Sequence, residues 1–501
     1  MNPNYSQLTN LIAEISELRA EWVLGGGFLL LILADLIFHF QKNKNATSYL
    51  TIISTIVLLI ALFFNIDDLQ NPVNKRLMYD MLVSTSPSAL IKIMIITCAG
   101  FTLAFTSIGK YKVPNEFFSL LMASTFGLSI TIMSSNWLTL LLGLEIVSLS
   151  FYTMVGFKFT KQSAEAALKY ILTGALATAL MLYGISFLYG FTGELNFTNP
   201  AYPYLLAEIK SHLAIFALLL ATCALLFKLS VVPLHIWAPD VYQATPLPIL
   251  SFIITATKIT AISVLLFYWN RYSNVSFYIN ENLKVNWSAI IAVVAILSLI
   301  VGNFSAVSQQ NLKRFVAYTS IAQIGFVLLA LLPNNRFGAE ATLFYIGTYA
   351  LSTFALLWLI HCFKAETFTE LAINARKNIV LALFLCVTLI SLAGLPPTFG
   401  FTTKFMVFTA LFEAYSSLSS VDPILANIYL SAFLVALATS LISFYYYLKI
   451  PYLIFIKKIE SDIENQAYKM NETSMNEVIF ASILVLPLII AFFINFPNLI
   501  R

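Results

Sequence analysis

The sequence predicts an all-α, polytopic membrane protein with about fourteen transmembrane helices. Of its 501 residues, 59% are hydrophobic and only 10% are charged, whereas about 25% of an average soluble domain is charged. Fourteen apolar runs are long enough to cross a bilayer core, which takes about 20 helical residues. The composition therefore excludes a soluble enzyme, and also a disordered chain, which needs low hydrophobicity and high charge.

The predicted spans follow one another with only short connections. They are residues 22–40, 49–65, 88–108, 116–134, 137–157, 165–190, 212–244, 248–269, 287–306, 313–333, 340–362, 378–414, 424–450 and 477–496. No connection is long enough for a separate domain, so we expect residues 1–501 to form a single membrane domain. The acidic segment before the first span does not match a cleaved signal peptide, so we expect that span to be retained.

The distribution of Lys and Arg predicts the orientation of these spans. With the N-terminus outside, fifteen loop Lys and Arg residues lie on the cytoplasmic side and eight on the opposite side. Cytoplasmic loops of membrane proteins are enriched in Lys and Arg. We therefore expect both termini outside and the charged loop near residues 457–477 in the cytoplasm.

Two of the spans are too long and contain helix-breaking residues. Residues 212–244 include Pro233 and Pro239, and residues 378–414 include a Gly/Pro cluster around Pro397. Proline removes a backbone donor and clashes with the preceding turn, so both spans are predicted to be discontinuous. Interrupted helices in corresponding positions of two halves are typical of ion sites in repeat-built transporters.

The spacing of the two breaks also predicts an internal repeat. The breaks fall in the seventh and twelfth spans, five spans apart. This spacing fits two five-helix repeats, at about residues 116–269 and 287–450. Because five is odd, the two repeats would have opposite orientations in the membrane.

Ionisable residues inside the spans are candidate functional residues, because a charge at the bilayer centre is costly. Lys258 lies in the middle of its span, too far from either end to reach water easily. Glu145 also lies between apolar turns and needs a nearby cation to stay ionised. Lys169 on the next span is the predicted partner, although such a pair could also serve only to fix helix packing. Lys92, near the start of its span, is expected to extend to the interface.

Each predicted break has an ionisable neighbour. Lys228 precedes the first break, His235 lies within it, and Lys404 follows the second. His235 could relay protons near neutral pH, or could be a hydrogen-bonded polar group beside Trp237 and Tyr242. Lysine is a poor metal ligand, so we expect no metal site. The six candidates, Glu145, Lys169, Lys228, His235, Lys258 and Lys404, fit a chain of proton-exchanging groups.

No cofactor or nucleic-acid signal accompanies these residues. The four cysteines, Cys98, Cys223, Cys362 and Cys386, lie in or at the edge of apolar runs and form no CxxC pair. No Gly-rich phosphate loop is visible. The formal net charge of +4 is too small to indicate a nucleic-acid partner. We therefore expect the lipid bilayer as the surroundings and no redox cofactor within this chain.

Three segments resemble a known family. They are "FKLSVVPLHIWAPDVYQATP", "NFSAVSQQNLKRFVAYTSIAQIGF" and "LAGLPPTFGFTTKF". They are similar to the antiporter-like membrane subunits of proton-pumping NADH:quinone oxidoreductase, respiratory complex I. The stretch "LLLGLEIVSLSFYTMVGF" and Lys404 in the twelfth span are most similar to the N type, called subunit 2 in mitochondria. The proline-broken segment is shared with subunits of multisubunit cation/proton antiporters.

The resemblance implies a fold, a function and partners. The family has fourteen helices, two inverted five-helix repeats and broken helices seven and twelve. The glutamate of its fifth helix falls on Glu145. The lysines of its sixth, seventh, eighth and twelfth helices fall on Lys169, Lys228, Lys258 and Lys404, and these residues would transfer protons. NADH, flavin, iron–sulfur clusters and quinone would belong to partner subunits, including other antiporter-like subunits, in the bacterial inner membrane. The alternatives are a subunit of a multisubunit cation/proton antiporter and a purely structural membrane spacer.

Overall fold

The computed structural model describes most of the chain and divides it into two compact units. The described residues are 14–41, 45–71, 75–208, 211–272, 276–280, 283–457 and 474–500. The first unit comprises Met1–Lys228, Ile259–Tyr268 and Phe277–Leu283. The second comprises Leu229–Lys258, Trp269–Ser276 and Lys284–Arg501. Each unit is described by itself below.

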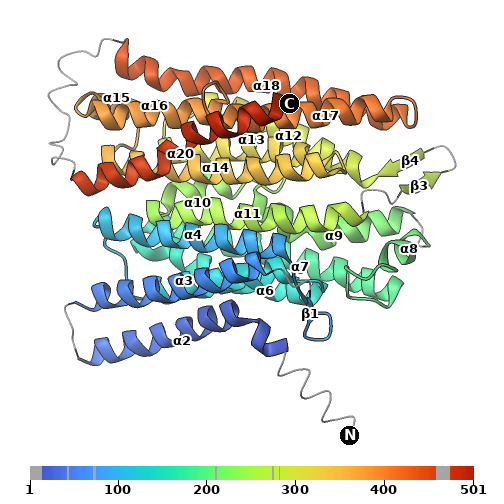
Figure 1. Cartoon of the computed structure of the whole chain (residues 1–501), viewed down its shortest axis with the longest axis horizontal. Coiled ribbons are helices and arrows are strands. Elements are labelled where there is room, and N and C mark those ends of the chain that lie inside the picture. Colours follow the sequence, from blue (N-terminus) through green and yellow to red (C-terminus); the bar gives the residue numbers. More distant parts are fainter. Residues whose placement is uncertain are drawn as a thin grey trace, which may run out of the picture. The chain divides into compact units, whose positions relative to one another are not determined.

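The first unit is a bundle of long helices that run side by side, as α2, α3 and α4 do in Figure 1. Its helices are α2 (Arg19–Phe40), α3 (Ala46–Gln70), α4 (Ser86–Ile108), α5 (Glu116–Met133), α6 (Trp137–Val155), α7 (Lys161–Thr192), the short α8 (Tyr202–Ala207) and α9 (Ser211–Leu229). A 3-10 turn, η1 (Gly156–Lys158), joins α6 to α7. An antiparallel hairpin, β1 (Lys75–Leu77) and β2 (Leu82–Ser84), joins α3 to α4.

The second unit is also helical. Its helices are α10 (Ala238–Ala244), α12 (Trp287–Val307), α13 (Leu312–Leu331), α14 (Arg336–Phe363), α15 (Phe368–Arg376), α16 (Ile379–Ala393), α17 (Phe399–Leu418), α18 (Pro423–Phe455) and α20 (Met475–Ile500). The long helix α11 (Leu247–Tyr272) contributes residues to both units. The strands β3 (Ser276–Asn280) and β4 (Leu283–Asn286) form a second two-stranded sheet.

The predicted spans agree with these helices. Among the described residues, thirteen helices are long and apolar enough to cross a membrane. They include α9, the first part of the predicted span 212–244, whose chain turns at residues 230–237 before α10. The predicted span 378–414 is divided into α16 and α17 by residues 394–398. The polytopic helical architecture with about fourteen segments and both predicted interruptions agree with the structure, while the inverted repeats and the orientation stay predictions.

Small residues bring several of these helices very close together. A Cβ atom added to Gly143 on α6 would lie 2.4 Å from Thr131 Oγ1 on α5. On α12, a Cβ atom added to Gly302 would lie 2.5 Å from the backbone nitrogen of Ala322 on α13. Such packing through small residues is a main source of helix association in membranes, where lipid is as apolar as the side chains.

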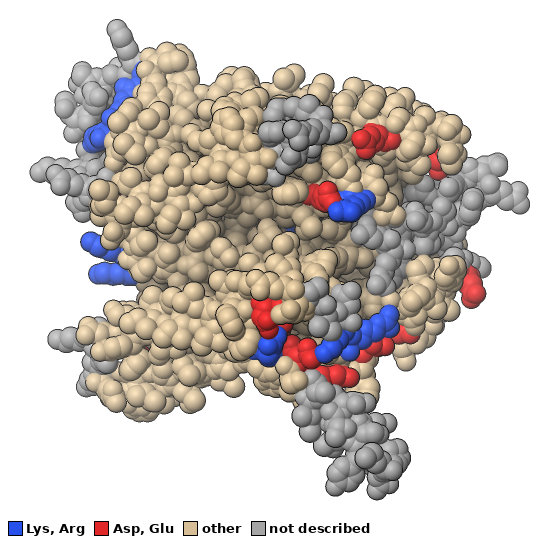
Figure 2. Space-filling model, in the orientation of Figure 1, with Lys and Arg blue, Asp and Glu red and all other residues tan. Residues whose placement is uncertain are grey.

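The surface fits a lipid environment. Large hydrophobic side chains are widely exposed, for example Phe63 at 66% and Leu441 at 69%. In Figure 2 most of the visible surface carries no charged side chain, and the charged groups lie mainly toward helix ends. The chain is therefore a multi-pass membrane protein.

Candidate functional site

In the first unit, Lys228 is buried at the end of α9, directly before the first break. Its side chain is 4% exposed, and its ammonium donates a hydrogen bond of 3.4 Å to the hydroxyl of Tyr170. The ammonium also lies over the rings of Tyr152 and Tyr170, 5.7 and 5.2 Å from their centroids. Aromatic faces stabilise a cation at these distances, so α6 and α7 together supply the surroundings of this charge.

Glu145 lies on α6, one helical turn before Ser148 and two turns before Tyr152. It is half-buried and close enough to Lys228 to interact electrostatically with its ammonium. Lys169 on α7 forms an ion pair of 2.9 Å with Glu165, one turn earlier on the same helix. Lys169 and Glu165 are both exposed, at 46% and 61% of their side chains. The predicted pairing of Lys169 with Glu145 stays a prediction.

In the second unit, the first break is held by polar contacts on both sides. The backbone N–H of Val232 donates to Ser298 Oγ on α12 at 3.1 Å. Beyond the break, Arg314 on α13 forms a 2.7 Å ion pair with Asp240 on α10. His235 lies between them and is half-buried, and among the described residues its Nδ1 atom has no hydrogen-bond partner.

Lys258 is fully buried near the middle of α11, as predicted. Its ammonium donates to the hydroxyl of Ser320 on α13 and lies 5.7 Å from the centre of the Tyr349 ring on α14. The Ser320 and Tyr349 hydroxyls are 2.6 Å apart and share a hydrogen bond. Lys258 therefore begins a short chain of groups that can each donate and accept hydrogen bonds.

Lys404 lies on α17, and its side chain reaches back across the second break. Its side chain is 5% exposed, and its ammonium donates to the carbonyl of Ala393 at 2.7 Å and to Ser443 Oγ at 3.5 Å. The last carbonyls of a helix have no partner within it, and Ala393 is the last residue of α16. The break thus exposes a backbone acceptor that the lysine occupies.

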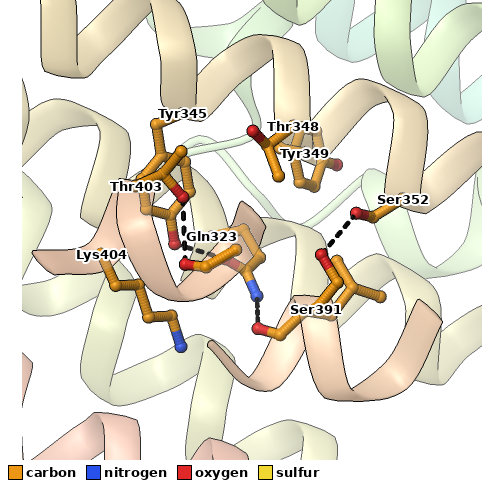
Figure 3. A pocket seen from close by; sticks show the side chains of 10 residues that line it. Gln323, Tyr345, Thr348, Tyr349, Ser352, Ser391, Thr403 and Lys404 are labelled. Carbon is orange, nitrogen blue, oxygen red and sulfur yellow. Dashed lines mark hydrogen bonds between the residues drawn. The ribbon is translucent and has the colours of Figure 1, made fainter. Parts of the chain in front are cut away.

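A small cavity lies beside Lys404 and has room for about one water molecule. Figure 3 shows Lys404, Gln323 and Tyr345 around it. Tyr345 donates to Gln323 Oε1 at 2.6 Å, while Gln323 Nε2 donates to the carbonyl of Leu392 at 2.9 Å. The same cavity is lined by Tyr349, so it connects the surroundings of Lys404 with the hydroxyl pair beside Lys258.

The structure distributes the six candidates between the two units. Glu145, Lys169 and Lys228 belong to the first unit, and His235, Lys258 and Lys404 belong to the second. Sequence reasoning missed the polar residues that surround the lysines, namely Tyr152, Tyr170, Ser320, Gln323, Tyr345, Tyr349 and Ser443. A glutamine in the middle of the span 313–333 was a usable signal for Gln323. Single tyrosines and serines are too common in apolar helices to have been recognised.

One sequence prediction was wrong. Lys92 on α4 does not extend to the interface. It is 1% exposed and forms a 3.0 Å ion pair with Glu21 on α2. The carboxylate of Glu21 on a neighbouring helix lets the Lys92 ammonium stay charged inside the bundle. The prediction considered only the helix that carries Lys92.

Comparison with known proteins identifies the family of this fold. The family described as "NADH:quinone oxidoreductase/Mrp antiporter, TM" matches residues 134–421. The chain belongs to this family. The matched range contains all six candidate residues and both breaks, and it omits helices α2 to α5, α18 and α20.

Two relatives within the family match over most of their length. An "NADH-quinone oxidoreductase subunit N" from Beijerinckia indica is 33% identical over 81% of this chain and 84% of its own. An "NADH-quinone oxidoreductase subunit N 2" from Chloroherpeton thalassium is 28% identical over 97% of this chain and 94% of its own.

Two solved structures share this fold. A chain of respiratory complex I from Thermus thermophilus is 26% identical, with a TM-score of 0.74 over 94% of this chain and 97% of that chain. A chain of the Mrp complex from Dietzia sp. DQ12-45-1b has a TM-score of 0.75 over 96% of this chain and 95% of that chain. At 17% identity, the second match shows the fold alone.

Proposed function

We propose that this chain is a proton-translocating membrane subunit of an NADH:quinone oxidoreductase in a bacterial inner membrane. One observation carries the proposal: three buried lysines, two beside helix breaks and one within a long helix, in a chain whose relatives are named subunit N of that enzyme. Lysine changes its charge when it gains or loses a proton, and burial makes that change sensitive to its neighbours. These residues can therefore hold and release protons within the membrane.

In the second unit, the proposed route runs from Lys258 to Lys404. A proton leaves Lys258 through the Ser320 and Tyr349 hydroxyls, which already share a hydrogen bond. It then crosses the small cavity lined by Tyr349 and Lys404. The side-chain amide of Gln323 neither gains nor loses a proton at physiological pH. Its hydrogen bonds instead hold Tyr345 and the end of α16 in place.

In the first unit, we assign Glu145 the role of controlling Lys228. A nearby carboxylate stabilises the charged form of a buried lysine, and loss of that carboxylate charge favours proton release. Lys169 can pair with Glu165, as in this structure, or turn toward Glu145. Exchange between these two partners would change the field at Lys228.

In the second unit, His235, with its unpartnered Nδ1 atom, is the proposed proton relay at the first break.

A membrane partner follows from the half-buried carboxylate of Glu145. Glu145 is only half-buried, and Leu142 and Leu149, three and four residues away on α6, are 61% and 62% exposed. A carboxylate at this depth cannot face lipid cheaply. We infer that another membrane subunit with a polar or cationic group covers this face of α6. We assign NADH, flavin, iron–sulfur clusters and quinone to other subunits of the same complex.

Lys258→Arg tests the proposal. Arginine keeps its proton even when buried, whereas a buried ammonium can release it. We expect the variant complex to assemble but to lose roughly nine-tenths of its NADH-driven proton pumping. Raising the barrier of one transfer step by about 1.4 kcal/mol already slows that step tenfold. Proton uptake into membrane vesicles, normalised to subunit content, measures the effect. Lys75→Arg, an exposed lysine in the hairpin, is the matched control. Full pumping by Lys258→Arg would reject proton exchange at Lys258.

The alternative is a subunit of a cation/proton antiporter, which the Mrp-like fold allows. Sodium flux driven by a salt gradient in proteoliposomes, without NADH or quinone, would favour that function. Full activity after neutralisation of Glu145 and all the candidate lysines would instead show a structural spacer. Co-purification with redox subunits together with loss of pumping in the lysine variants would support the oxidoreductase.

A further inference from the structure

A buried charge cluster lies outside the lysines discussed above, where three helices of the first unit meet. Lys92 Nζ on α4 donates to Glu21 Oε1 on α2 at 3.0 Å. Ser129 Oγ on α5 donates to the same carboxylate oxygen at 2.7 Å. The ammonium also lies 3.6 Å from the sulfur of Met133 on α5. One carboxylate oxygen therefore joins α2 to both α4 and α5.

The cluster is closed to water. The Lys92 and Glu21 side chains are 2% and 5% exposed, and Ser129 is 2% exposed. The β1–β2 hairpin leads directly into α4, and its Leu77 and Leu82 are buried, while Leu82 pairs with Ser134 just beyond α5. The thioether of Met133 is a weak acceptor, so Glu21 is the main counter-charge of the ammonium.

Helix α2 also packs against α3 and α5, and a Cβ atom added to its Gly27 would lie 2.4 Å from Val57 on α3. Among the described residues, however, Glu21–Lys92 is its only ion pair with both side chains buried. Only 17% of the residues in the most apolar stretch of this helix are buried within the protein. In lipid there is no hydrophobic driving force between apolar helices, so packing and polar contacts determine association.

The other charged contact of α2 joins Arg19 to Asp67 and Asp68 on α3. The Arg19 side chain is 40% exposed, and the two carboxylates are 36% and 18% exposed, so this contact is more accessible to water and contributes less than a buried pair.

We propose that Glu21, Lys92 and Ser129 form a charge-specific lock that positions α2 against α4 and α5. The pair is stable only when both charges are present, because loss of one partner leaves the other charge buried and unpaired. The lock holds a fixed charge pair and takes no part in proton transfer. This role is independent of the proposed function of the lysines at the breaks.

The test measures the docking of α2 within the complete complex in membranes. Cysteines introduced as Gly25→Cys on α2 and Phe126→Cys on α5 report docking through the yield of a short thiol-to-thiol cross-link, because a Cβ atom at Gly25 would lie 3.6 Å from the Phe126 ring. In this background we compare Glu21→Gln, Lys92→Met, the double variant Glu21→Gln/Lys92→Met, and Arg19→Gln as the matched exposed control on the same helix.

Each single variant should shift the docking equilibrium by about a hundredfold, as expected for an uncompensated buried charge. Arg19→Gln should change it by less than about fivefold. The double variant, which is neutral, should recover most of the cross-link and pump protons normally. Single variants no worse than Arg19→Gln, or losses that simply add in the double variant, would overturn the lock. A double variant that docks normally but does not pump would show that the pair handles protons and would equally overturn it.

Discussion

Each helix break has a buried lysine beside it, and different groups stabilise the two ammonium charges. Lys228 precedes the first break and lies in the last turn of α9, whereas Lys404 follows the second break and lies in the second turn of α17. Lys404 reaches back across its break to the carbonyl of Ala393. Lys228 instead lies over the rings of Tyr152 and Tyr170, with Glu145 acting on its charge.

This difference determines how each charge can be controlled. A backbone carbonyl at a helix C-terminus carries partial negative charge and cannot titrate, so the acceptor beside Lys404 keeps the same charge throughout a pumping cycle. The surroundings of Lys228 include a carboxylate, whose charge depends on its own partners. We therefore expect Lys228 to be switched by Glu145, and Lys404 to depend on the geometry of its break.

The largest effect should come from closing the second break. In Pro396→Ala/Pro397→Ala, both prolines that prevent helix continuation are removed, so α16 and α17 can join and the Ala393 carbonyl is used within the helix. Proton pumping should fall by at least about tenfold, because a buried ammonium without its acceptor costs about 3 kcal/mol. Pumping in vesicles, relative to assembled subunit, is the measurement.

Pro423→Ala is the control for that variant, since Pro423 lies at the first turn of α18, where proline is tolerated. It should keep nearly full pumping. Equal losses in the two variants would show that the break is incidental to the activity.

Glu145→Gln should give the next largest effect. The glutamine keeps the shape of the side chain but removes the charge that acts on Lys228, so pumping should fall several-fold, toward about tenfold for a change of 1.4 kcal/mol in one step. Glu165→Gln, which removes the exposed partner of Lys169, should have a smaller effect. NADH-driven proton uptake of the two variants at matched subunit content decides between them. If Glu165→Gln were the more damaging, Glu165 rather than Glu145 would control the charge.

The sequence predicted the architecture well because both signals are local. Apolar runs define the spans, and Pro233 and Pro397 define the breaks without reference to any neighbour. The lysines were found in the same way, since a charge in an apolar run is conspicuous. Their partners depend on which helix faces meet, so Ser320 beside Lys258 was not predictable. The prediction for Lys92 was wrong for the same reason, because its carboxylate partner, Glu21, is 71 residues away in the chain.

The smallest predicted effect concerns the residue that turns the chain at the second break. Gly394 ends α16 with φ at +80°, and a Cβ atom there would lie 2.4 Å from Lys404 Cδ. Gly193 ends α7 with φ at +67°, but a Cβ atom there would meet nothing within 4 Å. Both Gly→Ala variants bear the cost of a left-handed alanine, about 1 kcal/mol, whereas only Gly394→Ala also displaces Lys404.

We therefore expect Gly193→Ala to lower thermal stability slightly and to leave pumping per assembled complex unchanged. Gly394→Ala should lower pumping by about threefold, which corresponds to roughly 0.7 kcal/mol, because the ammonium no longer reaches the Ala393 carbonyl at its present distance. Measuring proton flux and melting temperature for both variants separates the two contributions. A pumping loss in Gly193→Ala equal to that in Gly394→Ala would mean that helix-end strain, and not the position of Lys404, limits the activity.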